Sequence, residues 1–213
     1  MSKPDTNAVE RRYVSQEVRM SNADDNNGVI EGYAAVYGAR ADLHYFEEEV
    51  LPGAFDEVLM DDVRCLINHD PQYVLARSVN GEGTLKLELD EKGLKYSYKT
   101  PNRSYAKDLQ DAIESGDVNQ SSFAFFVKED RWQKRDGKPD LRSIVKFSQL
   151  LDVSPVTYPA YDAATVGKRS WEARQAEKNT QKTEDKIQTN GDNSVKTLAL
   201  HEARHIITVN KSK

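Results

Sequence analysis

Three short segments of the chain carry side chains that together could perform nucleophilic catalysis. They are Asn68-His69-Asp70, Ser121-Ser122-Phe123-Ala124-Phe125 and Leu151-Asp152-Val153-Ser154-Pro155. A serine hydroxyl is a weak nucleophile that needs a base within hydrogen-bond reach, and that base needs a group that orients it. Each segment lies in or beside an apolar, strand-like stretch, so strands could bring the three together. We therefore take His69 as the candidate base, Ser122 as the candidate nucleophile and Asp152 as the candidate orienting acid.

Each of these residues also has a structural interpretation without chemistry. A single histidine is commonly a surface or hydrogen-bonded core residue, and paired serines before a strand commonly belong to a turn. Asp152 can lie at a strand end and point to solvent, although a carboxylate between Leu151 and Val153 is costly to bury without a partner. Ser121 and Ser122 are adjacent, but successive side chains of a strand point to opposite faces. Only one of them can face His69, and we assign Ser122.

The elements that must position these side chains follow from the hydrophobic pattern. Strict alternation over 84–89 and 94–99, joined by a turn that contains Gly93, predicts a β-hairpin. Apolar residues at helical spacing predict an amphipathic helix over 103–115. We also expect a short helix over 52–59 and strands over 29–37, 63–67, 122–127 and 144–156. The strand over 63–67 would deliver His69 at its end.

Composition excludes several classes of protein. The 213 residues carry a net charge of −5, which argues against a nucleic-acid binder with a basic surface. The one cysteine, Cys65, excludes an internal disulfide and is expected to be a small core residue in a reducing compartment. The sequence has no run of about 18 apolar residues that would span a membrane and no apolar N-terminal segment that would direct secretion. We therefore expect a cytoplasmic protein with no membrane or nucleic-acid partner.

The polar ends of the chain predict three regions. Residues 1–12 are expected to be a flexible N-terminus and residues 13–169 a compact domain. Residues 170–213 are expected to be a polar, flexible tail, because Lys, Glu, Gln, Asn, Asp and Thr dominate it. An apolar patch over 198–209 predicts a short terminal helix in this tail.

The order and the amino-acid sequences of several segments resemble those of the prohead (capsid maturation) protease family of HK97-like tailed phages and prophages. The resemblance spans about Val29 to Arg169. Its most specific parts are Pro52-Gly53-Ala54-Phe55, Asn68-His69-Asp70 and Asp152-Val153-Ser154-Pro155-Val156-Thr157-Tyr158-Pro159-Ala160.

The resemblance implies a serine endopeptidase related to the herpesvirus assembly proteases. The expected fold is mainly β, with a small closed β-barrel surrounded by helices. Carried over by motif, the family's histidine, serine and acid fall on His69, Ser122 and Asp152, and no cofactor or metal is implied. In the herpesvirus enzymes an arginine acts near the third triad member, and Arg142 and Arg169 are available here, although neither lies at a matching spacing.

The resemblance also implies substrates and a place of action. The substrates would be the scaffolding (delta) segment of the major capsid protein and the protease itself. Cleavage would take place inside the assembling procapsid, in the cytoplasm of the host bacterium. The sequence leaves open whether the chain forms a homo-oligomer.

Two alternatives stand beside this interpretation. The first is a non-catalytic capsid-assembly or scaffold protein on the same fold. The second is a zinc metalloprotease, because His201-Glu202-Ala203-Arg204-His205 matches a motif that places two histidines on one helix face. None of the eight residues after His205 is His, Asp, Glu or Cys, so the usual third ligand is missing. We interpret this segment as part of a short amphipathic tail helix.

Overall fold

A computed structural model describes residues 9–14, 18–21, 28–158, 168, 170–172, 174 and 175. The chain divides into two units, Met1–Arg169 and Ser170–Lys213. In the second unit the described residues are helical, and the terminal helix expected over 198–209 lies outside the described residues. No helix of the described part is long and apolar enough to cross a membrane.

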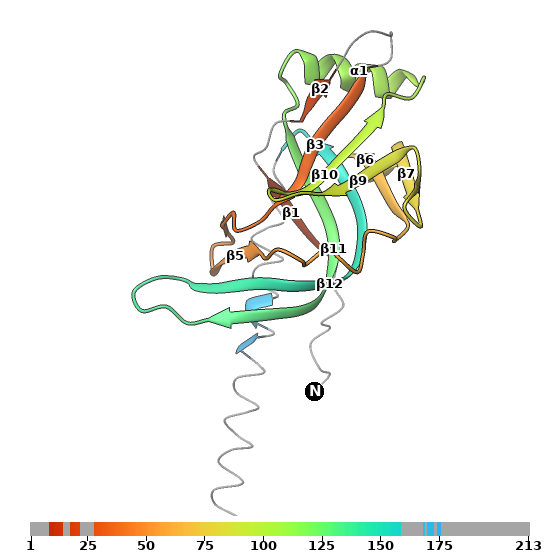
Figure 1. Ribbon diagram of the computed structural model, residues 1–213. Helices are drawn as coiled ribbons and strands as arrows, with labels where there is room; N and C mark the ends of the chain where they lie inside the picture. The colour runs from red at the N-terminus through yellow and green to blue at the C-terminus, as the bar shows by residue number, and fades with distance from the viewer. Residues whose placement is uncertain are drawn as a thin grey trace, which may run out of the picture. The chain divides into compact units, whose positions relative to one another are not determined.

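The larger sheet of the first unit has eight strands. Its main path runs β1-β11-β12-β6-β7-β8, and β5 pairs in parallel with β12 while β4 pairs with β5. Their bounds are β1 (Glu10–Val14), β4 (Ala41–Asp42), β5 (Phe46–Val50), β6 (Val63–Ile67), β7 (Asp70–Val79), β8 (Glu82–Gly83), β11 (Gln120–Gln133) and β12 (Asp140–Val156). The long antiparallel hairpin of β11 and β12 is its central feature, and one end of that hairpin projects from the rest of the unit (Figure 1).

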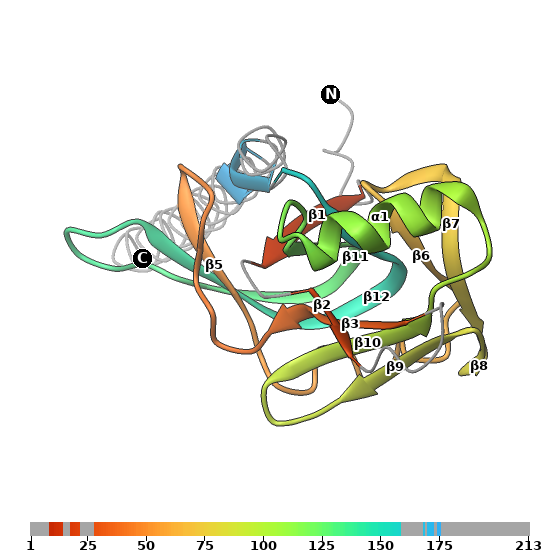
Figure 2. The same ribbon diagram turned by 90° about the horizontal axis from the view of Figure 1, so that it is seen from above.

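The second sheet has four strands, in the order β2-β3-β10-β9. These are β2 (Arg19–Ser21), β3 (Val29–Val36), β10 (Gly93–Lys99) and β9 (Leu85–Leu89). Figure 2 shows this sheet on one side of β11 and β12, with β1 on another. A hydrogen bond of 2.8 Å between Tyr96 Oη and Ser121 Oγ joins the two sheets. Gly32 permits this approach, because a Cβ there would lie 3.0 Å from Tyr96 Oη and 3.2 Å from Ser121 Oγ.

The core between the sheets is apolar and rich in aromatic side chains. Phe55, Phe123, Phe125 and Phe147 are buried and their rings contact one another. Cys65 is also buried, and burial raises the pKa of its thiol well above the ordinary value. Cys65 is therefore a core residue, as the sequence predicted, and not a thiolate nucleophile.

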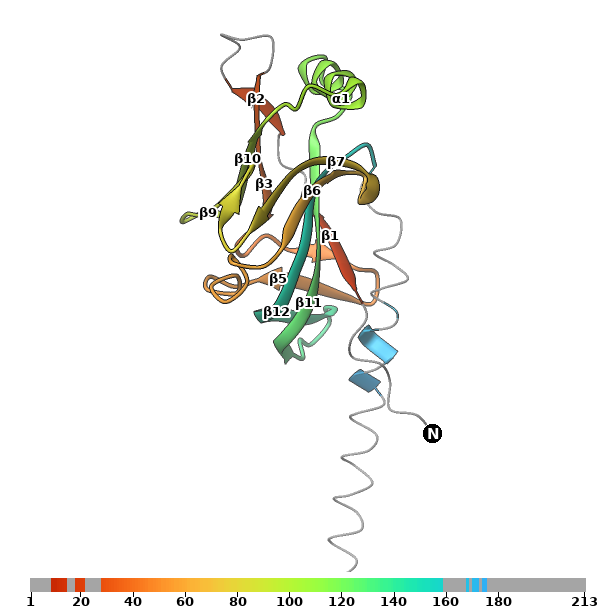
Figure 3. The same cartoon turned by 90° about the vertical axis from the view of Figure 1, so that its right-hand side faces the viewer.

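Helix α1 (Ser104–Glu114) lies at one end of the unit, close to β2 and β7 (Figure 3). Ala106, Leu109 and Ile113 form its buried face, so the amphipathic helix predicted over 103–115 is confirmed. The helix expected over 52–59 is wrong, because these residues form successive turns. Gly53 has φ of +85°, which a right-handed helix does not accommodate.

The prediction of a mainly β fold is confirmed, but the closed barrel with surrounding helices is not. In the described residues neither sheet closes on itself: the main path of the larger one ends at β1 and β8, and the smaller one ends at β2 and β9. Between residues 28 and 158, α1 is the one α-helix. The larger sheet also extends further toward the N-terminus than we expected, because β1 begins at Glu10, inside the region predicted to be flexible.

Candidate active site

The three candidate residues come from distant parts of the chain and meet on one side of the larger sheet. Ser122 lies in β11, where it pairs with Tyr13 of β1 and Ser154 of β12. Asp152 lies two residues before Ser154 on β12, and therefore projects to the same side of the sheet as Ser154. Ser121 points the other way, to Tyr96. The strand alternation that assigned Ser122 rather than Ser121 thus agrees with the contacts of both serines.

His69 reaches the site from the tight turn between β6 and β7. Ile67 and Asp70 pair directly, so Asn68 and His69 are the two central residues of the turn, with φ of +52° and +60°. Positive φ at both central positions is typical of the type I′ turns that suit a β-hairpin. Positive φ is uncommon for residues that carry a Cβ, although asparagine and histidine adopt it more often than most others. The backbone of His69 is therefore held in an uncommon conformation at the site.

Asn68 ties this turn to the end of β12. Its main-chain N–H donates to Pro155 O at 3.1 Å. Its side-chain Oδ1 accepts hydrogen bonds from Thr157 N at 2.9 Å and Thr157 Oγ1 at 3.1 Å. Because Asp152 lies on the same strand, these contacts fix the imidazole relative to the carboxylate.

The three side chains form one continuous hydrogen-bonded chain. His69 Nδ1 lies 2.5 Å from Asp152 Oδ1, and His69 Nε2 lies 2.7 Å from Ser122 Oγ. When Nδ1 carries the proton that it donates to Asp152, Nε2 is left as an acceptor for the serine hydroxyl. Ser154 Oγ donates to Asp152 Oδ1 at 2.8 Å and is fully buried. The carboxylate is thereby partnered from two sides, which offsets the cost of its burial.

The main chain of β1 also reaches the serine. Ser122 Oγ lies 2.9 Å from Arg12 O and donates to it. The hydroxyl has one proton and two acceptors within reach, so its proton moves toward His69 only when it is not directed at Arg12 O. Since β1 and β12 pair with β11 on its two sides, the amides beside Ser122 belong to a sheet.

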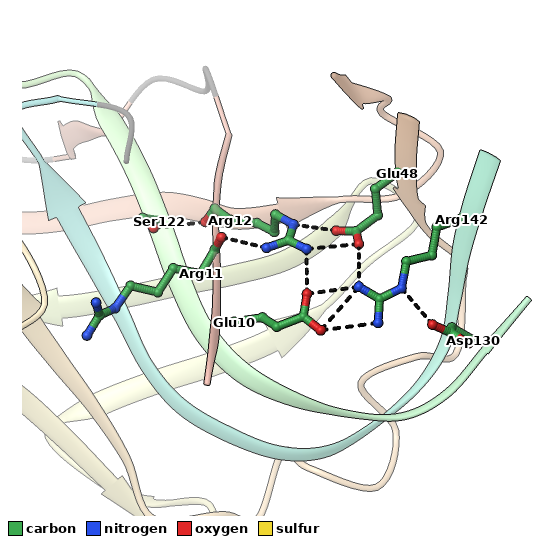
Figure 4. A network of polar contacts seen from close by, with 7 residues as sticks. All are labelled: Glu10, Arg11, Arg12, Glu48, Ser122, Asp130 and Arg142. Atoms are coloured by element: carbon green, nitrogen blue, oxygen red, sulfur yellow. Dashed lines mark hydrogen bonds and ion pairs between the residues drawn. The ribbon is translucent and has the colours of Figure 1, made fainter. Parts of the chain in front are cut away.

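A buried network of charges holds β1 beside the part of β11 that carries Ser122 (Figure 4). Arg12 pairs with Glu10 and Glu48, and Arg142 of β12 pairs with Glu10, Glu48 and Asp130. Burial by itself lowers the pKa of Arg12 and Arg142, but Glu48 and Glu10 more than offset this and raise both values. Arg142 is therefore committed to this network, and Arg169 lies outside the described residues.

Acidification is expected to weaken this network. Burial by itself raises the pKa of Glu10, but Arg12 and Arg142 reverse the shift and hold the pKa below its ordinary value of 4.5. A carboxyl with a lowered pKa stabilises the fold above its unfolded pKa, and the contribution disappears as the pH falls through the folded value. The free energy of unfolding should therefore fall below about pH 4.5. In urea titrations across this range Glu10→Gln should flatten the dependence on pH, and an unchanged slope would contradict the assignment.

The sequence indicated three of the residues that meet at this candidate site, and it did not indicate others. It missed Arg12, because a main-chain carbonyl leaves no signature in the sequence. It also missed Ser154, although the spacing Asp152-x-Ser154 on one strand places both on one face. The segment His201-Glu202-Ala203-Arg204-His205 lies outside the described residues.

Comparisons with known proteins find similarity to proteases of phage capsids. The sequence profile of a family described as caudovirus prohead serine protease matches residues 15–183. The prohead protease of enterobacteria phage HK97 is 29% identical over 147 residues, which cover 67% of this chain and 60% of that protein. The match thus spans less than two thirds of the HK97 protein. The structure of the bacteriophage T4 capsid assembly protease matches with a TM-score of 0.46 and 9% identity, over 70% of this chain and 96% of that one.

Proposed function

Because this chain belongs to the family of caudovirus prohead serine proteases, we propose that it is a serine endopeptidase of capsid maturation with Ser122, His69 and Asp152 as its catalytic triad. Its substrates are the scaffolding segment of the major capsid protein and the protease itself. Cleavage takes place inside the assembling procapsid in the host cytoplasm. The observation that carries the proposal is the hydrogen-bonded chain from Asp152 through His69 to Ser122.

The geometry supports a two-stage acyl transfer. His69 Nε2 takes the proton of Ser122 as Oγ attacks the carbonyl carbon of the scissile peptide bond. His69 then gives this proton to the leaving amine, and the carbon–nitrogen bond breaks to leave an acyl group on Ser122. In the second stage His69 takes a proton from water, the resulting hydroxide attacks the ester, and Ser122 recovers its proton. Asp152 holds the imidazole and stabilises its charged form in both stages.

Labelling and co-expression test this proposal. A fluorophosphonate should modify the protein, and mass spectrometry should locate the adduct on Ser122. Co-expression with the major capsid protein of the same phage should yield a capsid protein shortened at a defined site. A chelator added to the cleavage assay should not change this result. A chain that neither reacts with the probe nor processes the capsid protein would instead support the non-catalytic assembly role. Processing that a chelator abolishes would support the zinc mechanism.

Ser154 is expected to act as a positioning residue. Replacing it with alanine removes the hydroxyl that donates to Asp152 Oδ1, and kcat should fall roughly 10-fold with little change in KM. Ser143→Ala is a matched control, because Ser143 lies on the same strand and its hydroxyl donates to Glu49 at 2.8 Å, away from the triad. Equal effects of the two substitutions on kcat would contradict a role for Ser154 at the site.

A further inference from the structure

Strand β1 presents its side chains alternately to two sides of the larger sheet. Glu10 and Arg12 enter the buried charge network, and Arg11 leaves the strand on the opposite side, where Ser122 lies (Figure 4). The register agrees, because Arg11 pairs with Ala124 and Tyr13 pairs with Ser122. Directly paired residues of neighbouring strands project to the same side. The guanidinium of Arg11 therefore shares a face with the triad.

Arg11 is a charged group without a partner in the part of the chain that the structure describes. Its side chain makes no ion pair or hydrogen bond there, and its Nε atom is buried with no acceptor. The residue as a whole is only partly exposed. A buried donor that has no acceptor is rare in folded proteins and requires an explanation.

Two carboxylates in or beside the cross-strand row of Arg11, those of Asp152 and Asp62, are already engaged. The cross-strand row that begins at Arg11 continues through Ala124 to Asp152, then to Arg64 and Arg77. Asp152 is bonded to the triad histidine. The other two arginines of the row share the carboxylate of Asp62, at 2.7 to 3.0 Å. Arg11 is thus the arginine of this row that has no carboxylate.

The position of Arg11 places this free charge next to the reacting serine. It lies two residues from Tyr13, which opposes Ser122, and such neighbours on one face of a strand are about 7 Å apart. A guanidinium presents parallel N–H donors that match a carboxylate, and such charge-assisted pairs are stronger than neutral hydrogen bonds. A peptide whose scissile bond reaches Ser122 brings its neighbouring side chains within this distance.

We propose that Arg11 is a specificity-determining residue that binds an acidic side chain, Glu or Asp, within about two residues of the scissile bond. This inference rests on the proposed function and names the substrate class of the same site. The sequence 9–14 thus supplies both an ion-paired anchor, Glu10 and Arg12, and a recognition group, Arg11.

The test is a double-mutant cycle between Arg11 and the substrate. The cleavage site is first mapped by mass spectrometry, and each Glu or Asp in the two residues on either side is changed to Gln or Asn. With the unchanged substrate, Arg11→Ala should lower kcat/KM roughly 10- to 100-fold, mainly through KM. With the amide substrate, the wild-type protein should lose a similar factor and Arg11→Ala should cause no further loss. Arg11→Glu should favour a substrate with Lys at that position.

Three outcomes would overturn the inference: no acidic residue beside the cleavage site, equal cleavage of acid and amide substrates by the wild-type protein, or an equal loss on both substrates in Arg11→Ala. The last would mean that Arg11 only supports the fold. Each of these is distinct from failure of the proposed function, in which the wild-type protein itself would neither react with the fluorophosphonate nor cut the capsid protein.

Discussion

Replacing Ser122 with alanine is expected to lower kcat for peptide cleavage by roughly 10⁴- to 10⁶-fold, because the acyl-enzyme can no longer form. The loss should be nearly complete, since the roles proposed for His69 and Asp152 depend on this hydroxyl, to which the two residues are linked by hydrogen bonds. The fold should tolerate the change, because alanine fits the space of a fully buried serine. Mass spectrometry of the capsid protein after co-expression measures the outcome, and single-turnover assays of the purified chain give the factor.

Ser121→Ala is the matched control for this experiment. Ser121 is the adjacent residue and is equally buried, but its hydroxyl is bonded to Tyr96 Oη on the other side of the sheet. Its loss leaves a buried Tyr96 hydroxyl with fewer partners, which should lower the free energy of unfolding by about 1–3 kcal/mol. Processing of the capsid protein should continue. Cleavage that survives in Ser122→Ala and disappears in Ser121→Ala would reverse the assignment of the nucleophile.

Local patterns in the sequence were sufficient to predict several elements. The strand over 63–67 is β6, and the alternating segments over 84–89 and 94–99 are β9 and β10. These predictions succeeded because period-two alternation and helical spacing report burial on one face. The same alternation indicated that Ser121 and Ser122 point to opposite faces of the strand. His69 lies 53 residues from Ser122 and 83 residues from Asp152 in the chain. That these residues meet could be anticipated only from the chemistry that a serine nucleophile requires and from the family resemblance.

The features that were missed depend on distant partners. Glu10-Arg11-Arg12 looks like a solvated, charged terminus, yet Glu10 and Arg12 are buried because Glu48 and Arg142 neutralise them. Arg12 is bonded to Glu48, 36 residues away, and Arg142 to Glu10, 132 residues away. No local pattern reports such pairing. The helix expected over 52–59 does not form, because Gly53 adopts a positive φ and the segment turns instead.

Arg142→Met is expected to cause the largest loss of stability among single changes in the charge network. Arg142 is bonded to Glu10, Glu48 and Asp130, and its removal leaves two buried carboxylates with Arg12 as their shared cation. Breaking a buried ion pair from one side costs about 3–5 kcal/mol, because the remaining charge stays buried. In a domain of this size that corresponds to a fall in Tm of roughly 6–20 °C. Thermal and urea unfolding, followed by circular dichroism, measure both quantities.

Arg131→Met is the control that separates burial from charge. Arg131 lies on β11, and its pair with Glu129 spans 3.7 Å with the arginine side chain 71% exposed. An exposed pair of this kind contributes at most about 1 kcal/mol, so the two substitutions remove the same side-chain type with very different consequences. Because the network anchors β1, Arg142→Met should also loosen the strand that carries Arg11 and Arg12 O past Ser122. Equal small effects of both substitutions on Tm would mean that the network does not hold β1. The placement of this strand beside Ser122 would then have another cause.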